Sequence, residues 1–179
     1  MPTPFRPAVD LLADYATYHR DRRNIMTHLV GVPLIVFAIG VLLSRPAFAA
    51  GPLELTPAWA VFALAAAWYL TRGHLLAGLA TSVTMAMLLA AAQVLGHGQE
   101  HWLAWGAGLF VVGWIIQFIG HYYEGRKPAF VDDVTGLLVG PMFVVVEVLA
   151  AAGLCPGLAR EIERRAGPTT LRDLAHPVT

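Results

Sequence analysis

Charge is scarce in this 179-residue chain: only 13% of its residues are charged, against roughly 25% in a typical soluble domain. A surface with so few charges cannot be wetted on all sides, so part of it must face lipid. The formal net charge is zero, which does not favour nucleic acid as a partner. Because Cys155 is the single cysteine, an intrachain disulfide and a CxxC metal site are excluded. We expect its thiol to be a packing residue.

Apolar residues, in contrast, make up 57% of the chain, and they gather into long runs. The five runs are Ile25–Leu43, Ala58–Leu70, Leu75–Leu95, Trp102–Ile119 and Val134–Leu154. A helix needs about 20 apolar residues to cross a bilayer core of about 30 Å. The sequence therefore predicts an all-α, polytopic membrane bundle of four or five transmembrane or re-entrant helices, in which the first four runs span.

The fifth run differs from the others because it contains the helix breaker Gly140-Pro141 and the carboxylate Glu147. Both features are typical of a kinked or re-entrant segment. The cluster Arg20–Arg23 places the N-terminus in the cytoplasm by the positive-inside rule. A full fifth crossing would put the arginines of the C-terminal segment outside, which favours the re-entrant arrangement.

We expect one integral-membrane domain over residues 1–179. Residues 9–20 are predicted to form an amphipathic interfacial helix with Tyr15 and Tyr18 as anchors. Residues 25–154 form the membrane bundle, and residues 155–179 a cytoplasmic or peripheral tail that begins with a short charged helix. The stretch after Arg20 also imitates a secretory signal peptide, but its charged leader is long and its apolar run has full span length. A bacterial inner membrane, or one of endoplasmic-reticulum type, is the expected location.

This topology sorts the seven histidines by the side of the membrane on which they lie. Cytoplasmic helix ends carry four, the far side two and the tail one: His19, His28, His74 and His121, then His97 and His101, then His176. Imidazole is the commonest side-chain ligand for transition metals, so the four cytoplasmic histidines are candidate ligands. His19 and His28 would lie on opposite faces of one continuous helix, and they can share a site only if the chain breaks between them. Asp21 and Asn24 are both plausible caps at such a break.

Other polar residues at the same end are candidates for the site. Glu124 lies three residues after His121 on one helical face, and the nitrogen and oxygen of this pair suit ferrous iron. Glu124 has an alternative role as an ion-pair partner of Arg126 or Lys127. These two cations are topology determinants first, and they could also attract an acidic headgroup.

Each histidine taken singly also fits the simpler role of an interfacial polar group. The rival function is therefore a non-enzymatic membrane protein that binds lipid or scaffolds a partner. A transporter is disfavoured because the chain has no repeated halves. The small residues of Leu75–Leu95 suit close helix contacts and a possible homodimer.

Two stretches carry a resemblance to a known family. "YHRDRRNIMTHLVGVPLI" and "GWIIQFIGHYYEGRKPAFVDDVTGLLVGPMFVVVEVL" resemble the two signatures of the DUF962 or Mpo1-like membrane proteins, and the likeness extends from about Tyr15 to Leu149. The resemblance implies an iron(II) site at three histidines, His19, His28 and His121. Further matches to family positions are Asn24, Gln117, Glu124, Pro128 and Glu147, whereas His74 has no family counterpart.

The activity that the resemblance implies is an iron(II)-dependent dioxygenase. It would use O2 to cleave a 2-hydroxy fatty acid to CO2 and a fatty acid one carbon shorter, which is α-oxidation. We expect metal ligands and catalytic groups among His19, His28, His121, His74 and Glu124. Substrate-binding residues are expected to be Asn24, Gln117, Arg126 and Lys127. Zinc stays open as the metal, because imidazoles alone do not select iron.

Overall fold

The structure, a computed structural model, describes residues 5–50 and 53–174. Its elements are α1 (Ala8–Ala16), α2 (Arg22–Leu42), β1 (Phe48–Ala50), β2 (Leu53–Leu55), α3 (Pro57–Leu70), α4 (Leu75–Gly98), α5 (Trp102–Glu124), the 3-10 turn η1 (Ala129–Val131), α6 (Gly136–Ala151) and α7 (Pro156–Ala166). Within this part of the chain, the antiparallel hairpin β1–β2 is the only sheet. The predicted all-α class is confirmed.

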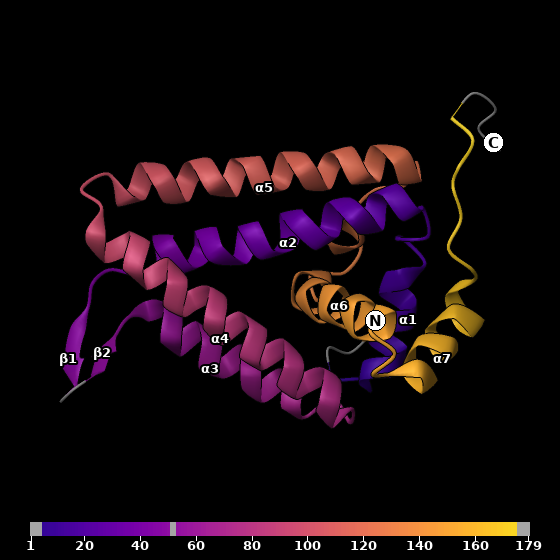
Figure 1. Ribbon diagram of the computed structural model, residues 1–179, viewed down its shortest axis with the longest axis horizontal. Coiled ribbons are helices and arrows are strands. Elements are labelled where there is room, and N and C mark those ends of the chain that lie inside the picture. The colour runs from indigo at the N-terminus through magenta and orange to yellow at the C-terminus, as the bar shows by residue number, and fades with distance from the viewer. Residues whose placement is uncertain (1–4, 51–52, 175–179) are drawn as a thin grey trace.

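Four helices, α2 to α5, form an elongated rod in which successive helices run in opposite directions; the pairs α2–α5 and α3–α4 meet near the β-hairpin and diverge toward the other end (Figure 1). The closest pair is α2 and α5, which lie side by side along most of their length. Glycines on α5 permit this approach: a Cβ added at Gly113 would lie 2.6 Å from Cγ1 of Ile35 on α2. Small residues at helix contacts are the usual way in which helices pack closely in lipid.

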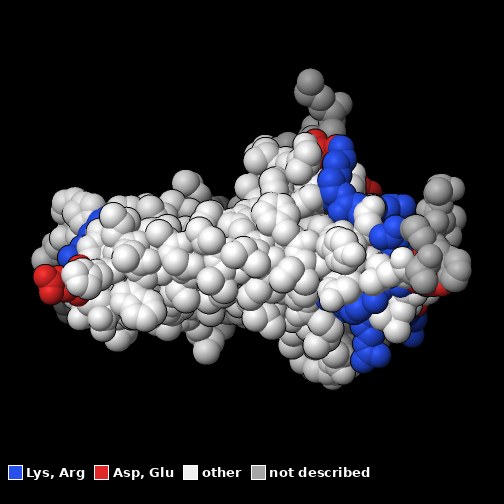
Figure 2. Space-filling model, turned by 90° about the horizontal axis from the view of Figure 1, so that it is seen from above, with Lys and Arg blue, Asp and Glu red and all other residues white. Residues whose placement is uncertain are grey.

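Three helices of the described part, α2, α4 and α5, are long and apolar enough to cross a membrane. The prediction that Ala58–Leu70 spans is wrong by length, because α3 has 14 residues and covers only about 21 Å, short of a core of about 30 Å. It packs along α4 instead. Figure 2 shows an uncharged midsection with the lysines, arginines and acidic residues gathered at the two ends.

A wider head at one end of the rod is built from α1, α6 and α7 (Figure 1). Helix α6 is seen nearly end-on where α2 and α5 run across the view, so it crosses the rod instead of following it. Helices α6 and α7 meet at a bend of 117°. Beyond α7, Thr170 pairs with the start of α2, where its carbonyl accepts from the Arg22 N–H at 2.9 Å. The fifth segment is therefore sharply bent, which fits a broken span as well as a re-entrant loop, and the re-entrant arrangement stays a prediction.

The N-terminal helix is more enclosed than the interfacial prediction implied. Leu11, Leu12 and Ala16 are buried, and α1 packs against α6 and α7. Cys155 is buried within the same core, so its predicted packing role is confirmed. His176 lies outside the described residues.

Candidate functional site: a three-histidine cluster

Three of the four histidines assigned to the cytoplasmic end meet in one place. His19, His28 and His121 each offer a ring nitrogen, and these nitrogens lie within 4.8 Å of one another. The rings come from the α1–α2 connection, from α2 and from the last turn of α5. All three side chains are buried. Among the described residues, no other cluster of three or more histidine, cysteine or carboxylate side chains meets this distance.

A break in the chain brings His19 and His28 together although nine residues separate them. Helix α1 ends at Ala16, and α2 begins at Arg22 after the N-cap Asp21, whose side chain accepts from the Arg23 N–H at 2.8 Å. The predicted break near Asp21–Asn24 is confirmed. Because the helix is interrupted between them, His19 can face a residue that a continuous helix would hold on its opposite side.

Hydrogen bonds to backbone carbonyls set the tautomers of two rings. His19 Nδ1 lies 2.7 Å from the Tyr15 carbonyl oxygen, and His28 Nδ1 lies 2.9 Å from that of Asn24. A carbonyl oxygen only accepts, so each Nδ1 carries the proton and each Nε2 has a free lone pair. A histidine that binds a metal through one ring nitrogen usually donates a hydrogen bond from the other, as Nδ1 does in both rings here.

The two Nε2 atoms face each other at 3.0 Å. With both lone pairs directed inward there is no proton to join them, so a cation between or beside them would relieve the repulsion. Two ring nitrogens that share one metal at about 2.1 Å each lie at most about 4.2 Å apart, so a separation of 3.0 Å is short enough for both to bind it. Burial, followed by the proximity of His28, lowers the pKa of His19 well below its ordinary value, which keeps its ring neutral, the form that binds metals. The donor set therefore fits a transition metal.

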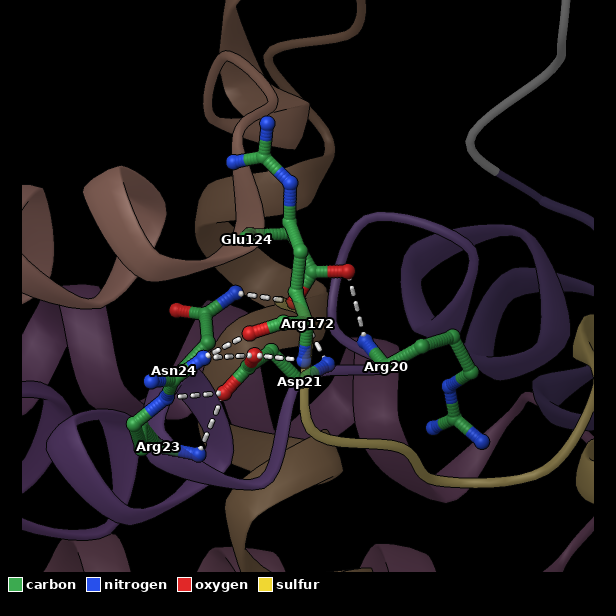
Figure 3. Close-up of polar contacts among 6 residues, drawn as sticks. All are labelled: Arg20, Asp21, Arg23, Asn24, Glu124 and Arg172. Carbon is green, nitrogen blue, oxygen red and sulfur yellow. Dashed lines mark hydrogen bonds and ion pairs between the residues drawn. The ribbon is translucent and has the colours of Figure 1, made fainter. Parts of the chain in front are cut away.

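Glu124 ties together the segments that carry these rings (Figure 3). Its carboxylate accepts from the backbone N–H groups of Arg20 and Asp21 at 2.9 and 2.8 Å, and from the Asn24 amide at 3.0 Å. It thus joins the residues after His19 to the end of α5, one turn beyond His121. Neither the expected metal ligation nor the alternative ion pair with a neighbouring cation describes these contacts. In this structure Glu124 holds these segments together, and Asn24 belongs to the same network; ligation of a metal by Glu124 stays a prediction.

The C-terminal segment is hydrogen-bonded to the α1–α2 connection. Asp21 Oδ2 accepts from the Arg172 N–H at 2.8 Å and pairs with the Arg23 guanidinium at 2.7 Å (Figure 3). Burial alone would raise the pKa of Asp21, but the hydrogen bonds from Arg23 and from the Arg172 and Arg23 N–H groups lower it to about 2. The carboxylate is therefore charged at neutral pH and holds the tail against the start of α2.

An apolar cavity of about 220 Å³ opens beside the cluster, and His28, His121 and Gln117 are among the residues that line it. Gln117 is only 4% exposed, and neither its amide nitrogen nor its amide oxygen has a hydrogen-bond partner. His121 Nδ1 is also buried without a partner. Unpaired buried polar atoms carry a desolvation cost, and here they gather at the point where the cavity meets the histidines.

Tyr15 is a site residue that sequence reasoning misplaced as a membrane anchor. Its ring stacks on His19 with centroids 4.1 Å apart and an interplanar angle of 9°. Its carbonyl also holds His19 Nδ1, so it orients this ring in two ways. The spacing of four residues between Tyr15 and His19 within a helical pattern was the available signal.

The remaining predicted residues lie away from the cluster. His74 caps α4, where its Nδ1 accepts from the Ala77 N–H at 3.2 Å, and it does not join the three rings. Arg126 donates to the Thr17 carbonyl, and Lys127 pairs with Asp132. Neither cation lines the apolar cavity.

Glu147, a further family position, does not face the histidines either. It lines a separate small cavity together with Arg20 and Glu163. Its half-buried side chain therefore lies where α6 packs near the α1–α2 connection and α7.

Comparison with known proteins identifies the family. The family model described as "2-hydroxy-palmitic acid dioxygenase Mpo1-like" matches residues 5–152. A curated relative, the 2-hydroxy-palmitic acid dioxygenase MPO1 of Saccharomyces cerevisiae, is 31% identical over 154 residues, which are 85% of each chain. No solved structure matches significantly. The chain belongs to the Mpo1-like family, as the two signatures indicated.

Proposed function

We propose that this member of the Mpo1-like family is an iron(II)-dependent dioxygenase that cleaves the bond between C1 and C2 of a 2-hydroxy fatty acid. The reaction balances with one O2: the 2-hydroxy acid gives a fatty acid one carbon shorter, CO2 and water. The observation that carries the proposal is the cluster of three buried imidazoles at the polar end of an apolar cavity. The name of the yeast relative agrees with this chemistry.

His19, His28 and His121 would hold the metal through neutral ring nitrogens. Bound iron(II) supplies electrons and open coordination positions for chemistry with dioxygen. The backbone carbonyls of Tyr15 and Asn24 keep the protons of two rings on Nδ1, so that both Nε2 atoms stay available. Glu124 and the stacked Tyr15 ring fix the relative positions of the histidines.

The substrate head is expected to meet Gln117 beside the histidines. Its unpaired amide can donate to a carboxylate and accept from the 2-hydroxyl, which are the two groups that distinguish this substrate from other lipids. The burial of Gln117 also excludes bulk water from the reacting carbons. Arg126 and Lys127 lie at the surface, where their role would be to attract the acidic head before it binds.

We also propose that the histidine end faces the cytoplasm. Lysine and arginine side chains are concentrated there, around α1, α7 and the α5–α6 connection, and the positive-inside rule assigns such an end to the cytoplasm. A substrate that reaches this site keeps its head at the membrane surface and its chain among lipid.

The test is the metal content of anaerobically purified protein, measured for wild type, His28→Ala and His121→Ala. His97→Ala is the matched control, because His97 lies at the opposite end, where its ring contacts the Ser44 carbonyl at 2.9 Å. We expect about one iron per chain in wild type and in the control, and loss of iron in the two other variants without loss of helicity by circular dichroism. Oxygen uptake with 2-hydroxypalmitate, and none with palmitate, should follow the iron.

Three other outcomes would each change the conclusion. Zinc in place of iron after iron loading would keep the site and discard the oxygenase. Wild type without any transition metal would favour the alternative of a lipid-binding or scaffolding membrane protein. Iron without uptake on 2-hydroxy acids would retain the metal site and reject the substrate.

A further inference from the structure

The apolar cavity follows one face of α2 and one face of α5. On α2 it is lined at helical spacings of three and four residues by His28, Val32, Ile35, Val36 and Ile39. On α5 the lining residues show the same periodicity, in the opposite chain direction: Phe110, Trp114, Gln117 and His121. The third wall comes from η1 and α6 and their connection, with Phe130 and Pro141 among its residues. Such spacings place each set on a single stripe of its helix.

The polar groups of this cavity are confined to one end. Because the two helices are antiparallel neighbours, His28 lies at the same level along the cavity as His121, and Ile39 at the same level as Phe110. Eleven residues separate the two ends on each helix, a distance of about 16 Å. No lysine, arginine, aspartate or glutamate lines the cavity. A ligand that fits it therefore has a polar head at the histidines and an unbranched apolar body of limited length.

We propose that this cavity is the acyl-chain subsite of the enzyme, and that Ile39 and Phe110 at its far end set the chain length beyond which further carbons do not improve binding. The proposal rests on the proposed function, since it takes the head of the same substrate to lie at the histidines. About a dozen carbons of an extended chain fill the distance from His28 to Ile39. Carbons beyond these leave the cavity and contact lipid, so they add nothing further to binding.

The direction of the cavity supports a chain that comes from the surrounding bilayer. It runs along α2 and α5, which are both membrane-span candidates, and therefore in the direction that lipid chains take. Val32, Ile35, Trp114 and Phe110 are only partly buried, so the cavity is open along its side. A fatty acid in the same leaflet can move in laterally with its head kept at the surface.

The neighbouring cavity is chemically unsuited to this role. It is separated from the apolar one by the shared residues Tyr15, Ala129 and Gly136. Charged groups line it, with Arg6, Asp14, Asp132 and Asp133 among them, and these would lose hydration against a hydrocarbon chain. Tyr15 thus lies between a polar cavity and an apolar one.

Oxygen uptake by iron-loaded enzyme should be measured with saturated 2-hydroxy acids of increasing length. For wild type, kcat/KM is expected to rise about fourfold per methylene and to level off near a dozen carbons. Phe110→Ala should move the plateau to longer chains by about two carbons, and Ile39→Phe should move it to shorter ones. Val111→Ala is the control, because Val111 is exposed on the outer face of α5, and its profile should match wild type. Unshifted plateaus in both cavity variants would overturn the proposal while leaving the dioxygenase intact.

A binding experiment separates this subsite from the reaction. Fatty acids brominated at successive carbons quench nearby tryptophan, and Trp114 lines the middle of the cavity. The difference in quenching between wild type and Trp114→Phe should be largest when the bromine lies near the middle of the fatty-acid chain, with or without iron. Such a peak without oxygen uptake would keep the subsite and reject the dioxygenase. Quenching that does not depend on bromine position would reject the subsite.

Discussion

The Glu124 network yields the sharpest test of how this site is held together. Three donors converge on one carboxylate, two of them backbone N–H groups and the third the Asn24 amide. A hydrogen bond to a charged group contributes about 1.5 to 3 kcal/mol, and donors left without a partner cost more. Because water reaches part of this side chain, we take the low end and expect Glu124→Ala to lower the free energy of unfolding by about 4 kcal/mol. Glu124→Gln keeps one acceptor and should lose about half as much.

In a chain of this size, 1 kcal/mol corresponds to about 2 to 4 °C in Tm. We therefore expect the Tm in detergent to fall by about 8 to 15 °C for Glu124→Ala and by about half of that for Glu124→Gln. Iron affinity should fall about 10- to 100-fold in both, as it does when a group that orients metal ligands is lost. Glu161→Gln is the matched control: Glu161 also accepts three hydrogen bonds, from Arg164 and Arg165, on the exposed side of α7. Exposed pairs contribute little, so its Tm should change by less than about 3 °C.

Two results would refute this reasoning. If Glu124→Gln has the Tm of wild type and binds iron equally well, the carboxylate does not hold the segments that carry the histidines. If Glu124→Ala keeps the wild-type Tm but retains no iron at all, Glu124 is a direct ligand and not a positioning residue. Both quantities come from the same purified samples, by differential scanning fluorimetry and by metal titration.

Further substitutions test the two residues whose placement the fold decided. A Cβ at Gly31 would lie 2.6 Å from the Gln117 Nε2 atom, so Gly31→Ala should displace that amide and lower kcat/KM for 2-hydroxypalmitate about tenfold. The iron content, measured by elemental analysis, should not change. Activity equal to that of wild type would exclude Gln117 from substrate binding. His74→Ala should keep full iron content and lower stability by about 1 kcal/mol, the usual contribution of a helix cap; loss of iron would instead restore His74 as a ligand.

The sequence by itself determined at which depth along the helix bundle each candidate residue lies. The order of the apolar runs assigns a residue to one end of the bundle, because successive helices joined by short connections run in opposite directions, whether or not each is long enough to cross lipid. This is why His19, His28 and His121 were correctly placed at a common end. The cap at Asp21 likewise predicted the break that lets two of these rings meet.

Depth, however, does not say which helices are neighbours, and that was decided by tertiary packing. His74 shares the end of the bundle but belongs to α4, whereas α2 packs mainly on α5 through glycine contacts. Hydropathy likewise does not distinguish a tyrosine at the membrane surface from one stacked on a ligand ring, as Tyr15 is. Nor does it reveal that the Glu124 carboxylate closes a turn 100 residues earlier in the chain. Such contacts depend on the lateral arrangement of the helices and on the direction in which α6 crosses them, which local sequence periodicity does not encode.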